Sequence, residues 1–175
     1  MRQAALPDAR LRGERAAAAS DRLIAAARRE LGRLDALVIR AMPRRRASAR
    51  TASLRAWQVL LDGSLRAAFF TARAAGLTMQ AAGQGAIVFV IDRAADDDAS
   101  AVVVREGLMC LADGLARALA PAHVAQVVID GRPRAIAAVS DEAIAGAIRA
   151  VLARADGAAV GVVRLRPPRS RLPSG

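Results

Sequence analysis

The chain has 175 residues, of which 54% are hydrophobic, and it carries a formal net charge of +11. This length predicts a single domain with one core, and no apolar run approaches the ~20 residues that a membrane span requires. All 27 basic residues are arginines spread along the chain with few aromatic residues, so we expect neither a nucleic-acid nor a membrane partner. Cys110 is the single cysteine, which excludes a disulfide framework and favours a cytoplasmic location.

The first half of the chain predicts two helices around one short strand. Residues 1–18 are an Arg-rich lead-in, which we expect to be disordered or to hold an irregular strand around residues 9–12. Ser20 or Asp21 supplies an N-cap for the first helix, and Gly32 ends it. The elements predicted in this half are a helix at 21–31, a strand at 34–39 (LDALVI) and a long helix at 54–80.

The second half alternates apolar strands with amphipathic helices. Residues 85–92 (GAIVFVID) are a continuous apolar run, as expected for a strand buried on both faces. In the helix that follows, apolar residues recur at spacings of three and four, which gives one buried helical face. This alternation predicts an α/β fold with a parallel sheet and helices on both faces. The other elements expected here are a helix at 101–120, a strand at 123–129, a helix at 141–152, a strand at 159–165 and a flexible tail at 168–175.

Five motifs of the chain occur in an order that one protein family shares. They are GRLDALV (32–38), LRAAFFTARAA (65–75), GQGAIVFV (83–90), GLARALAP (114–121) and HVAQVVIDG (123–131). In type, order and spacing, these segments resemble the short-chain dehydrogenase/reductase family. The resemblance implies a partial Rossmann-like parallel sheet of about four to five strands. It also implies that the domain, over residues 19–167, lacks the family's first βαβ unit, because only about 20 residues precede the first recognisable helix.

The chain departs from the family's catalytic set of Asn, Ser, Tyr and Lys. In the resembled family, the tyrosine exchanges a proton with the substrate, and the lysine assists it and holds the nicotinamide ribose. The matching motifs place Ser64 at the Asn position, Asp92 at the Ser position, Arg105 at the Tyr position and Met109 at the Lys position. The family's Asn-Asn-Ala-Gly signature beside the cofactor is replaced by Ile39, Arg40, Ala41 and Met42.

These replacements remove the chemistry that the resemblance implies. Arginine stays protonated at neutral pH and cannot serve as a general acid, and methionine has no charge with which to hold a ribose. The chain contains no tyrosine and no lysine that could substitute from elsewhere, and loss of the acid–base group alone costs on the order of 10²–10⁴ in rate. We therefore expect no catalytic residue and no cofactor in this chain by itself, with NAD(P) held by a partner subunit.

Several polar residues are interpreted as structural. We expect Asp92 and Arg105 to form an ion pair that closes the former cleft, with anion binding through Arg105 as the alternative. Asp96, Asp97 and Asp98 form an acidic loop, for which solvation is favoured over binding of a hard metal. His123 opens a strand without other metal-ligating residues at suitable spacing. Cys110 is expected to be a small buried side chain.

The apolar helix faces persist although the catalytic set does not. In the resembled family, the helices that correspond to residues 54–80 and 101–120 pack against a second subunit, and the strand at 34–39 is expected at an exposed sheet edge. We therefore expect a non-catalytic dehydrogenase-like subunit that pairs with itself or with an active, full-length homologue, which it stabilises or regulates. The alternatives are a residual or repurposed NAD(P)-dependent oxidoreductase and a small-ligand binding module. The expected interface residues are Trp57, Leu65, Phe69, Leu108, Leu111 and Leu115.

Overall fold

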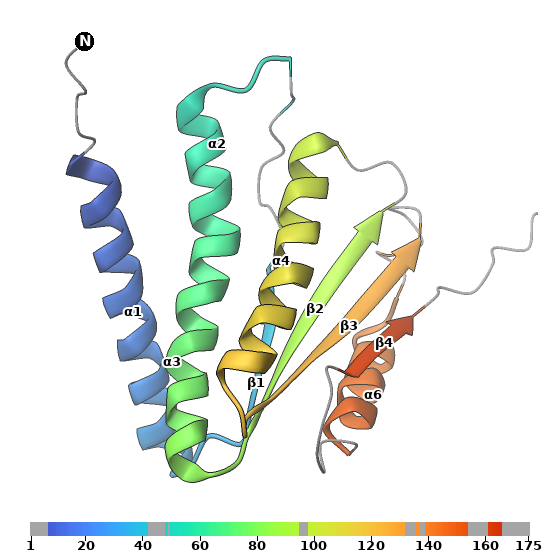
Figure 1. The fold of residues 1–175 in the computed structure, drawn as a ribbon. Coiled ribbons are helices and arrows are strands. Elements are labelled where there is room, and N and C mark those ends of the chain that lie inside the picture. The colour runs from blue at the N-terminus through green and yellow to red at the C-terminus, as the bar shows by residue number, and fades with distance from the viewer. Residues whose placement is uncertain are drawn as a thin grey trace, which may run out of the picture.

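A computed structural model of the chain describes residues 7–41, 48, 50–94, 98–131, 136, 139–153 and 161–165. Within these residues, strands alternate with helices along the chain (Figure 1). The strands are β1 (Ala36–Arg40), β2 (Ala86–Ala94), β3 (His123–Gly131) and β4 (Gly161–Leu165). The helices are α1 (Pro7–Leu31), α2 (Leu54–Leu61), α3 (Ala67–Ala82), α4 (Ala99–Ala118) and α6 (Asp141–Leu152), with a π-helical segment, η1 (Asp62–Arg66), between α2 and α3.

The described strands form one four-stranded parallel sheet in the order β1-β2-β3-β4. Every strand therefore pairs with its neighbour in sequence, and each crossover passes through a helix or a longer connection. The prediction of an α/β fold with a parallel sheet of about four to five strands is confirmed. β1 lies at one edge of this sheet, as its sequence led us to expect, and its alternate residues Ala36, Val38 and Arg40 are exposed.

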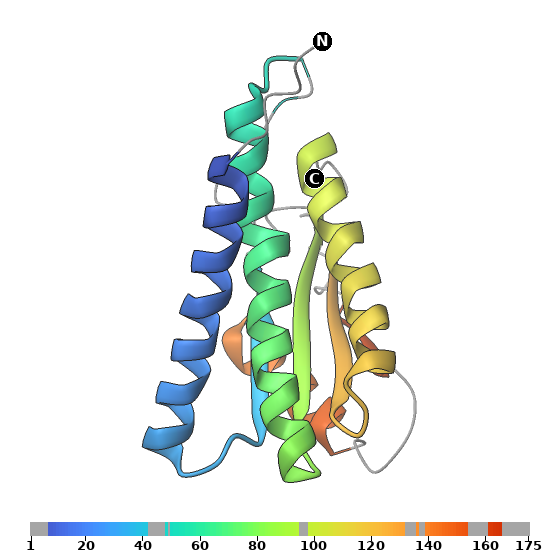
Figure 2. The ribbon, with the colours of Figure 1, turned by 60° about the vertical axis from the view of Figure 1, so that its left-hand side comes forward.

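The two faces of the sheet are covered unequally. Figures 1 and 2 show α1, the continuous α2–η1–α3 helix and α4 side by side along one face, while α6 lies against the other. Side chains alternate between the faces along a strand. In β2, Ile87, Phe89 and Ile91 pack into the larger core with α3 and α4, whereas Val88 and Val90 pack into a smaller core with α6.

Side-chain caps fix where three of the helices begin. Ser53, Asp98 and Ser140 each have extended backbone and accept a hydrogen bond from the backbone N–H three residues later, at 3.1, 2.9 and 3.2 Å. Such a cap satisfies an N–H that has no partner within the helix. Gly83 ends α3 with a left-handed φ of 72°, which glycine adopts without a Cβ penalty.

The first helix is longer than its sequence suggested. The prediction of an irregular strand around residues 9–12 is wrong, because α1 already begins at Pro7. Proline is compatible with the first helical turn, and the alanines before Ser20 have the highest helix propensity. Ser20 is therefore inside α1, where its buried hydroxyl forms a hydrogen bond of 3.1 Å with the hydroxyl of Thr71 instead of capping the helix. The tail predicted at 168–175 lies outside the described residues.

Candidate functional site

The carboxyl ends of the four strands gather charged side chains at one edge of the sheet. In open α/β sheets, this edge is where ligands bind. Here the charges divide between the two faces: one pair lies on the face that α6 covers, and a larger group lies on the face that α4 covers. The division follows from the alternation of side chains along β2, β3 and β4.

Asp92, at the family's Ser position, lies on the face of the sheet opposite to α4. It follows Val88 and Val90, which pack against α6, because β2 runs without interruption to Ala94. Its carboxylate binds the guanidinium of Arg40 through contacts of 3.0, 3.2 and 3.3 Å, and the Asp92 side chain is only 6% exposed. This is a bidentate pair across the β1–β2 contact.

The predicted ion pair between Asp92 and Arg105 is therefore wrong. Arg105 belongs to α4, on the other side of the sheet, where its Nε donates to Glu106 Oε1 at 3.0 Å. The prediction assumed a turn directly after the apolar run, as a strand of the family's usual length would give. Instead β3 extends just as far, and the pairing of Arg93 with Asp130 and of Ala94 with Gly131 keeps β2 straight past Asp92.

Met109, at the family's Lys position, takes part in packing and in one backbone contact. Its side chain is half-buried against the larger core. Its carbonyl accepts a hydrogen bond of 3.3 Å from the side-chain amide of Gln126, and the same amide donates to Asp113 Oδ1 at 2.8 Å. Gln126 is 2% exposed, and its Oε1 has no hydrogen-bond partner among the described residues. The polar side chain next to Met109 is thus Gln126 of β3, which donates a hydrogen bond to the α4 backbone.

Ser64, at the family's Asn position, lies in the π-helical segment η1. It is 1% exposed, and its hydroxyl donates to the carbonyl of Leu60 at 2.6 Å. A π-turn of this kind inserts one residue into a helix and is frequent at functional sites. The following residue, Leu65, packs so closely on Gly107 of α4 that a Cβ at Gly107 would lie 2.9 Å from its methyl carbons. The hydroxyl of Ser64 therefore serves the helix and is not presented to a ligand.

The segment at the family's Asn-Asn-Ala-Gly position is absorbed into the fold. Ile39 and Ala41 pack against the larger core, and Arg40 holds Asp92. Met42 lies outside the described residues. The described residues of this segment thus contact the protein's own side chains.

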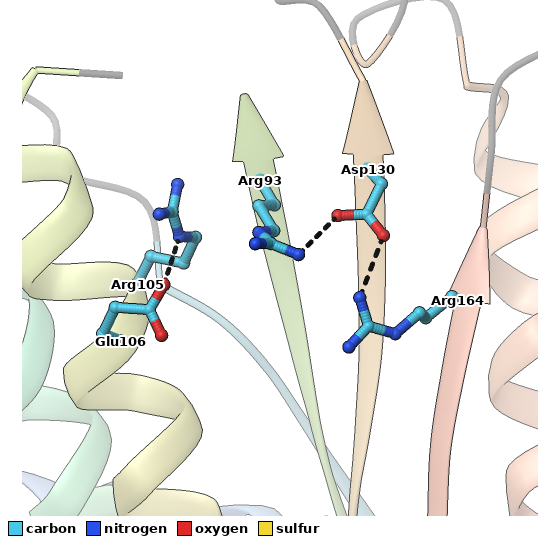
Figure 3. Close-up of polar contacts among 5 residues, drawn as sticks. All are labelled: Arg93, Arg105, Glu106, Asp130 and Arg164. Atoms are coloured by element: carbon cyan, nitrogen blue, oxygen red, sulfur yellow. Dashed lines mark hydrogen bonds and ion pairs between the residues drawn. The ribbon is translucent and has the colours of Figure 1, made fainter. Parts of the chain in front are cut away.

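The face of the sheet that α4 covers carries three charged residues that the sequence analysis did not single out. Arg93, Asp130 and Arg164 come from β2, β3 and β4, and Figure 3 shows Asp130 between the two arginines. Asp130 Oδ1 lies 3.5 Å from Arg93 Nη1, and Asp130 Oδ2 lies 3.3 Å from Arg164 Nη1. The available signal was a charged residue at or just beyond the end of each apolar run, at positions that parallel pairing brings close together.

Two of the six predicted interface residues are buried within the chain. Leu108 and Leu115 are 1% and 6% exposed, because they lie on the stripe of α4 that faces the sheet. Trp57, Leu65 and Leu111 are half-buried against the larger core, whereas Phe69 is 38% exposed. The prediction of an interface role is therefore wrong for Leu108 and Leu115 in the free chain.

An apolar surface does exist at the start of α2 and α4. Leu54 is 68% exposed and Val103 is 41% exposed. Together with Trp57, they line a pocket of about 380 Å³ between the two helices. Phe69 adds exposed apolar area farther along the α2–η1–α3 helix. We call Leu54, Trp57, Phe69 and Val103 the α2–α4 apolar surface.

The remaining predictions concern cysteine, metal and membrane sites. Cys110 is exposed on α4, so the expectation that it is buried is wrong; it lies on the solvent side of the helix, away from the buried stripe. Within the described ranges, no three His, Cys, Asp or Glu residues gather where they could hold a metal ion. His123 is half-buried at the start of β3. No helix in the part of the chain that the structure describes is long and apolar enough to cross a bilayer.

Among the described residues, those at the family's catalytic positions do not supply its acid–base group. A guanidinium stays protonated at neutral pH, so Arg105 cannot exchange a proton with a substrate. Asp92 is nearly buried and engaged by Arg40 on the wrong face for a reaction beside α4. What the carboxyl edge can offer on the α4 face is hydrogen-bond donation from arginine side chains to an anionic group.

The comparisons with known proteins agree on one family. The sequence profile described as short chain dehydrogenase matches residues 14–130, which is more than half of the chain. No curated protein sequence matches the chain significantly.

Solved structures share the fold at low sequence identity. A metagenomic short-chain oxidoreductase in complex with NADP is 23% identical, with a TM-score of 0.69 over 87% of this chain and 70% of that chain. A short chain dehydrogenase from Mycobacterium smegmatis is 21% identical, with a TM-score of 0.70 over 89% of this chain and 67% of that chain. The chain spans between 46% and 70% of the length of eight solved structures that it matches. Identities in this range show a common fold.

Proposed function

The chain belongs to the short-chain dehydrogenase family, and from this premise we propose that it is a non-catalytic subunit of an NAD(P)-dependent oxidoreductase complex. Its partner would be a homologous, full-length dehydrogenase or reductase, which it stabilises or regulates. We place this assembly in the cytoplasm. The proposal depends on one observation: the scaffold of the family is intact where it packs, while each described residue at a catalytic position contacts the protein's own groups.

The chemistry at the catalytic positions supports the lack of activity. Arg105 replaces the proton donor with a permanently charged group, and Met109 replaces the ribose-binding ammonium with a thioether. The Ser64 hydroxyl donates a hydrogen bond to a helix carbonyl, and Asp92 forms an ion pair with Arg40 on the face of the sheet opposite to α4. Loss of a general acid–base group costs on the order of 10²–10⁴ in rate. The carboxylates on the α4 face, Asp130 and Glu106, are each paired with arginine side chains.

The residues at these positions also do not fit a nicotinamide cofactor. In the resembled family, the nicotinamide ribose needs a cationic donor on the helix equivalent to α4. The side chain of Met109 offers no hydrogen-bond donor, and its half-buried packing leaves it within the core. We therefore derive no reaction step through a nicotinamide held by these residues, and we propose that any NAD(P) in the complex is bound by the partner subunit.

The α2–α4 apolar surface is the proposed contact with that partner. Leu54 and Val103 expose 68% and 41% of their area to solvent. Fully burying an exposed Val or Leu side chain is worth about 1.5–3 kcal/mol, so a partner that covers these partly exposed side chains gains a fraction of that free energy from each. Trp57 at the centre supplies the large, amphipathic side chain that interface hot spots favour.

Co-purification tests the proposed partner. The chain is co-expressed with an intact short-chain dehydrogenase encoded beside it, and the amount of the complex is compared for Leu54→Glu and Leu23→Glu. Leu23 is a matched control, because it is also an exposed leucine, 58% accessible, but lies on α1 outside the α2–α4 apolar surface. We expect L54E to reduce recovery at least ~tenfold and L23E to leave it unchanged. Recovery of the chain as a monomer from every co-expression would contradict the proposal.

Nicotinamide titration separates this function from its alternative, a residual oxidoreductase. The chain and the complex are titrated with NADH and NADPH by calorimetry. We expect heat from the complex alone. Binding to the isolated chain, lost on substitution of Arg105 or Asp92, would favour the oxidoreductase and end the proposal of a non-catalytic subunit.

A further inference from the structure

The strands β2, β3 and β4 carry a second polar feature, independent of the catalytic positions. Arg93, Asp130 and Arg164 lie on the same face of the sheet, at the carboxyl ends of three adjacent strands (Figure 3). Arg93 pairs in register with Asp130, and Arg164 pairs with Val128, two residues before Asp130. The central carboxylate is therefore flanked by a guanidinium from each neighbouring strand.

This arrangement places one carboxylate between two guanidinium groups, so it neutralises only one of their two positive charges. One carboxylate faces two arginines, so the three residues carry a net charge of +1. Each guanidinium has five N–H donors, and each arginine contacts Asp130 through one nitrogen, Arg93 at 3.5 Å and Arg164 at 3.3 Å. The Arg93 and Arg164 side chains are 43% and 49% exposed, and Asp130 is 22% exposed. Asp130 is thus the most buried of the three side chains, and the two arginine side chains are partly exposed to solvent.

A merely structural ion pair would be built differently. The pair of Arg40 with Asp92 shows the structural version: one guanidinium, one nearly buried carboxylate and three contacts of 3.0–3.3 Å. The Asp130 contacts are longer and single, and the carboxylate is shared. Because the carboxyl ends of the strands are also the ligand edge of an open α/β sheet, we propose that Arg93 and Arg164 bind the oxyanion group, carboxylate or phosphate, of a small molecule, with Asp130 as the residue that orients them.

Arg105 and Glu106 border this site from α4. Figure 3 shows them beside the three strand residues, with the Arg105 guanidinium on Glu106. A forked oxyanion matches two guanidinium groups because each can donate two parallel hydrogen bonds to it. This site does not depend on the proposed partner function.

Calorimetry with inorganic phosphate and with succinate, at one constant ionic strength, tests the proposal on the full chain. We expect one site that weakens at least ~tenfold in Arg93→Gln and in Arg164→Gln. Arg149→Gln is the matched control, because Arg149 is also an exposed, ion-paired arginine but lies on α6; its affinity should stay within about twofold of wild type. Binding of phosphate alone would assign the site to a phosphate group, and binding of both to a general oxyanion.

A second measurement uses the unaltered chain and so does not depend on how the variants fold. The Nε–Hε resonances of Arg93 and Arg164 should move on addition of phosphate or succinate, while that of Arg149 stays in place. No saturable binding of either anion, or equal weakening in the Arg149 control, would overturn the proposal. The same holds if the Arg149 resonance moves as much as those of Arg93 and Arg164.

Discussion

The interior of the contact between the sheet and α4 differs sharply from the carboxyl edge of the same elements. In the interior, Phe89, Val104 and Leu108 are at most 1% exposed and pack together in the larger core. At the edge, a few residues farther along, ion pairs stand where the family's catalytic groups would be. The difference teaches that the core can keep its packing when the catalytic residues are replaced. Buried positions restrict the volume and polarity of their side chains, whereas positions at the exposed carboxyl edge accept different polar residues.

The largest effect is expected in the interior. Phe89→Ala removes a ring from the centre of the larger core and should lower the free energy of unfolding by about 3–5 kcal/mol. Urea denaturation measures this change. Phe69→Ala is the control, since Phe69 is 38% exposed and contacts Phe70 edge-on at 5.2 Å. An equal loss from both substitutions would show that the interior is not better packed than the surface.

The pair at the β1–β2 edge should respond asymmetrically. Arg40→Met leaves the carboxylate of Asp92, 6% exposed, without its partner, which should cost about 3 kcal/mol. Asp92→Asn leaves Arg40, 42% exposed, to be solvated by water and should cost less than about 1 kcal/mol. Thermal and urea unfolding of both variants provide the measurement. If Asp92→Asn lowered the free energy of unfolding more than Arg40→Met, the expected asymmetry between the two partners would be contradicted.

Gln126 lies on the boundary between the two regions and should have a small effect. Gln126→Met keeps the volume, removes the unpartnered Oε1 and releases Asp113, which is exposed to solvent. We expect a change within about 1 kcal/mol, because loss of the amide contacts is offset by loss of a buried unpaired acceptor. Gln126→Ala, which leaves a cavity, serves as the comparison and should be clearly worse in the same unfolding assay. A strongly destabilising Gln126→Met would point to a partner for Oε1 that the described residues do not supply.

The smallest effect is expected at the opposite, amino-terminal end of the sheet. Arg33 Nε donates to both carboxylate oxygens of Asp35 at 2.8 and 2.7 Å, and this hydrogen bonding lowers the pKa of Asp35. A lowered pKa in the folded state stabilises the fold above the ordinary carboxyl pKa, and the contribution is lost as pH falls through the folded value. The Arg33 and Asp35 side chains are 71% and 53% exposed, so the effect on stability is slight. In an NMR titration, Arg33→Gln should raise the pKa of Asp35, and an unchanged pKa would refute the contact.

Regular elements with strong periodicity could be predicted from the sequence. The apolar run at β2, the caps Ser53 and Ser140, and the strand–helix alternation follow from local rules that burial reinforces. The start of α1 could not be predicted, because the Arg-rich segment before Ser20 has no apolar periodicity, and its helix is stabilised by packing on α3. The prediction that Leu108 and Leu115 contact a partner failed because an apolar helical face has the same sequence pattern whether it packs on a sheet or on another subunit.

The arrangement of the site was harder to predict than the fold. Asp92 was assigned to the α4 face because its position was inferred from a motif, yet the extra residues of β2 up to Ala94 determine its face. Whether a strand continues past its apolar run depends on its neighbours, and here β3 supplies the pairing. The Arg93, Asp130 and Arg164 cluster depends on the register of three strands, which no single segment reveals.

The position of Trp57 makes the chain its own optical reporter. The protein has one tryptophan and no tyrosine, and this indole lines the pocket between α2 and α4. Intrinsic fluorescence therefore comes from a single indole, whose emission shifts to shorter wavelength when water leaves its surroundings. Docking of another molecule onto this pocket would be visible without any label, in real time and at the concentrations where association occurs.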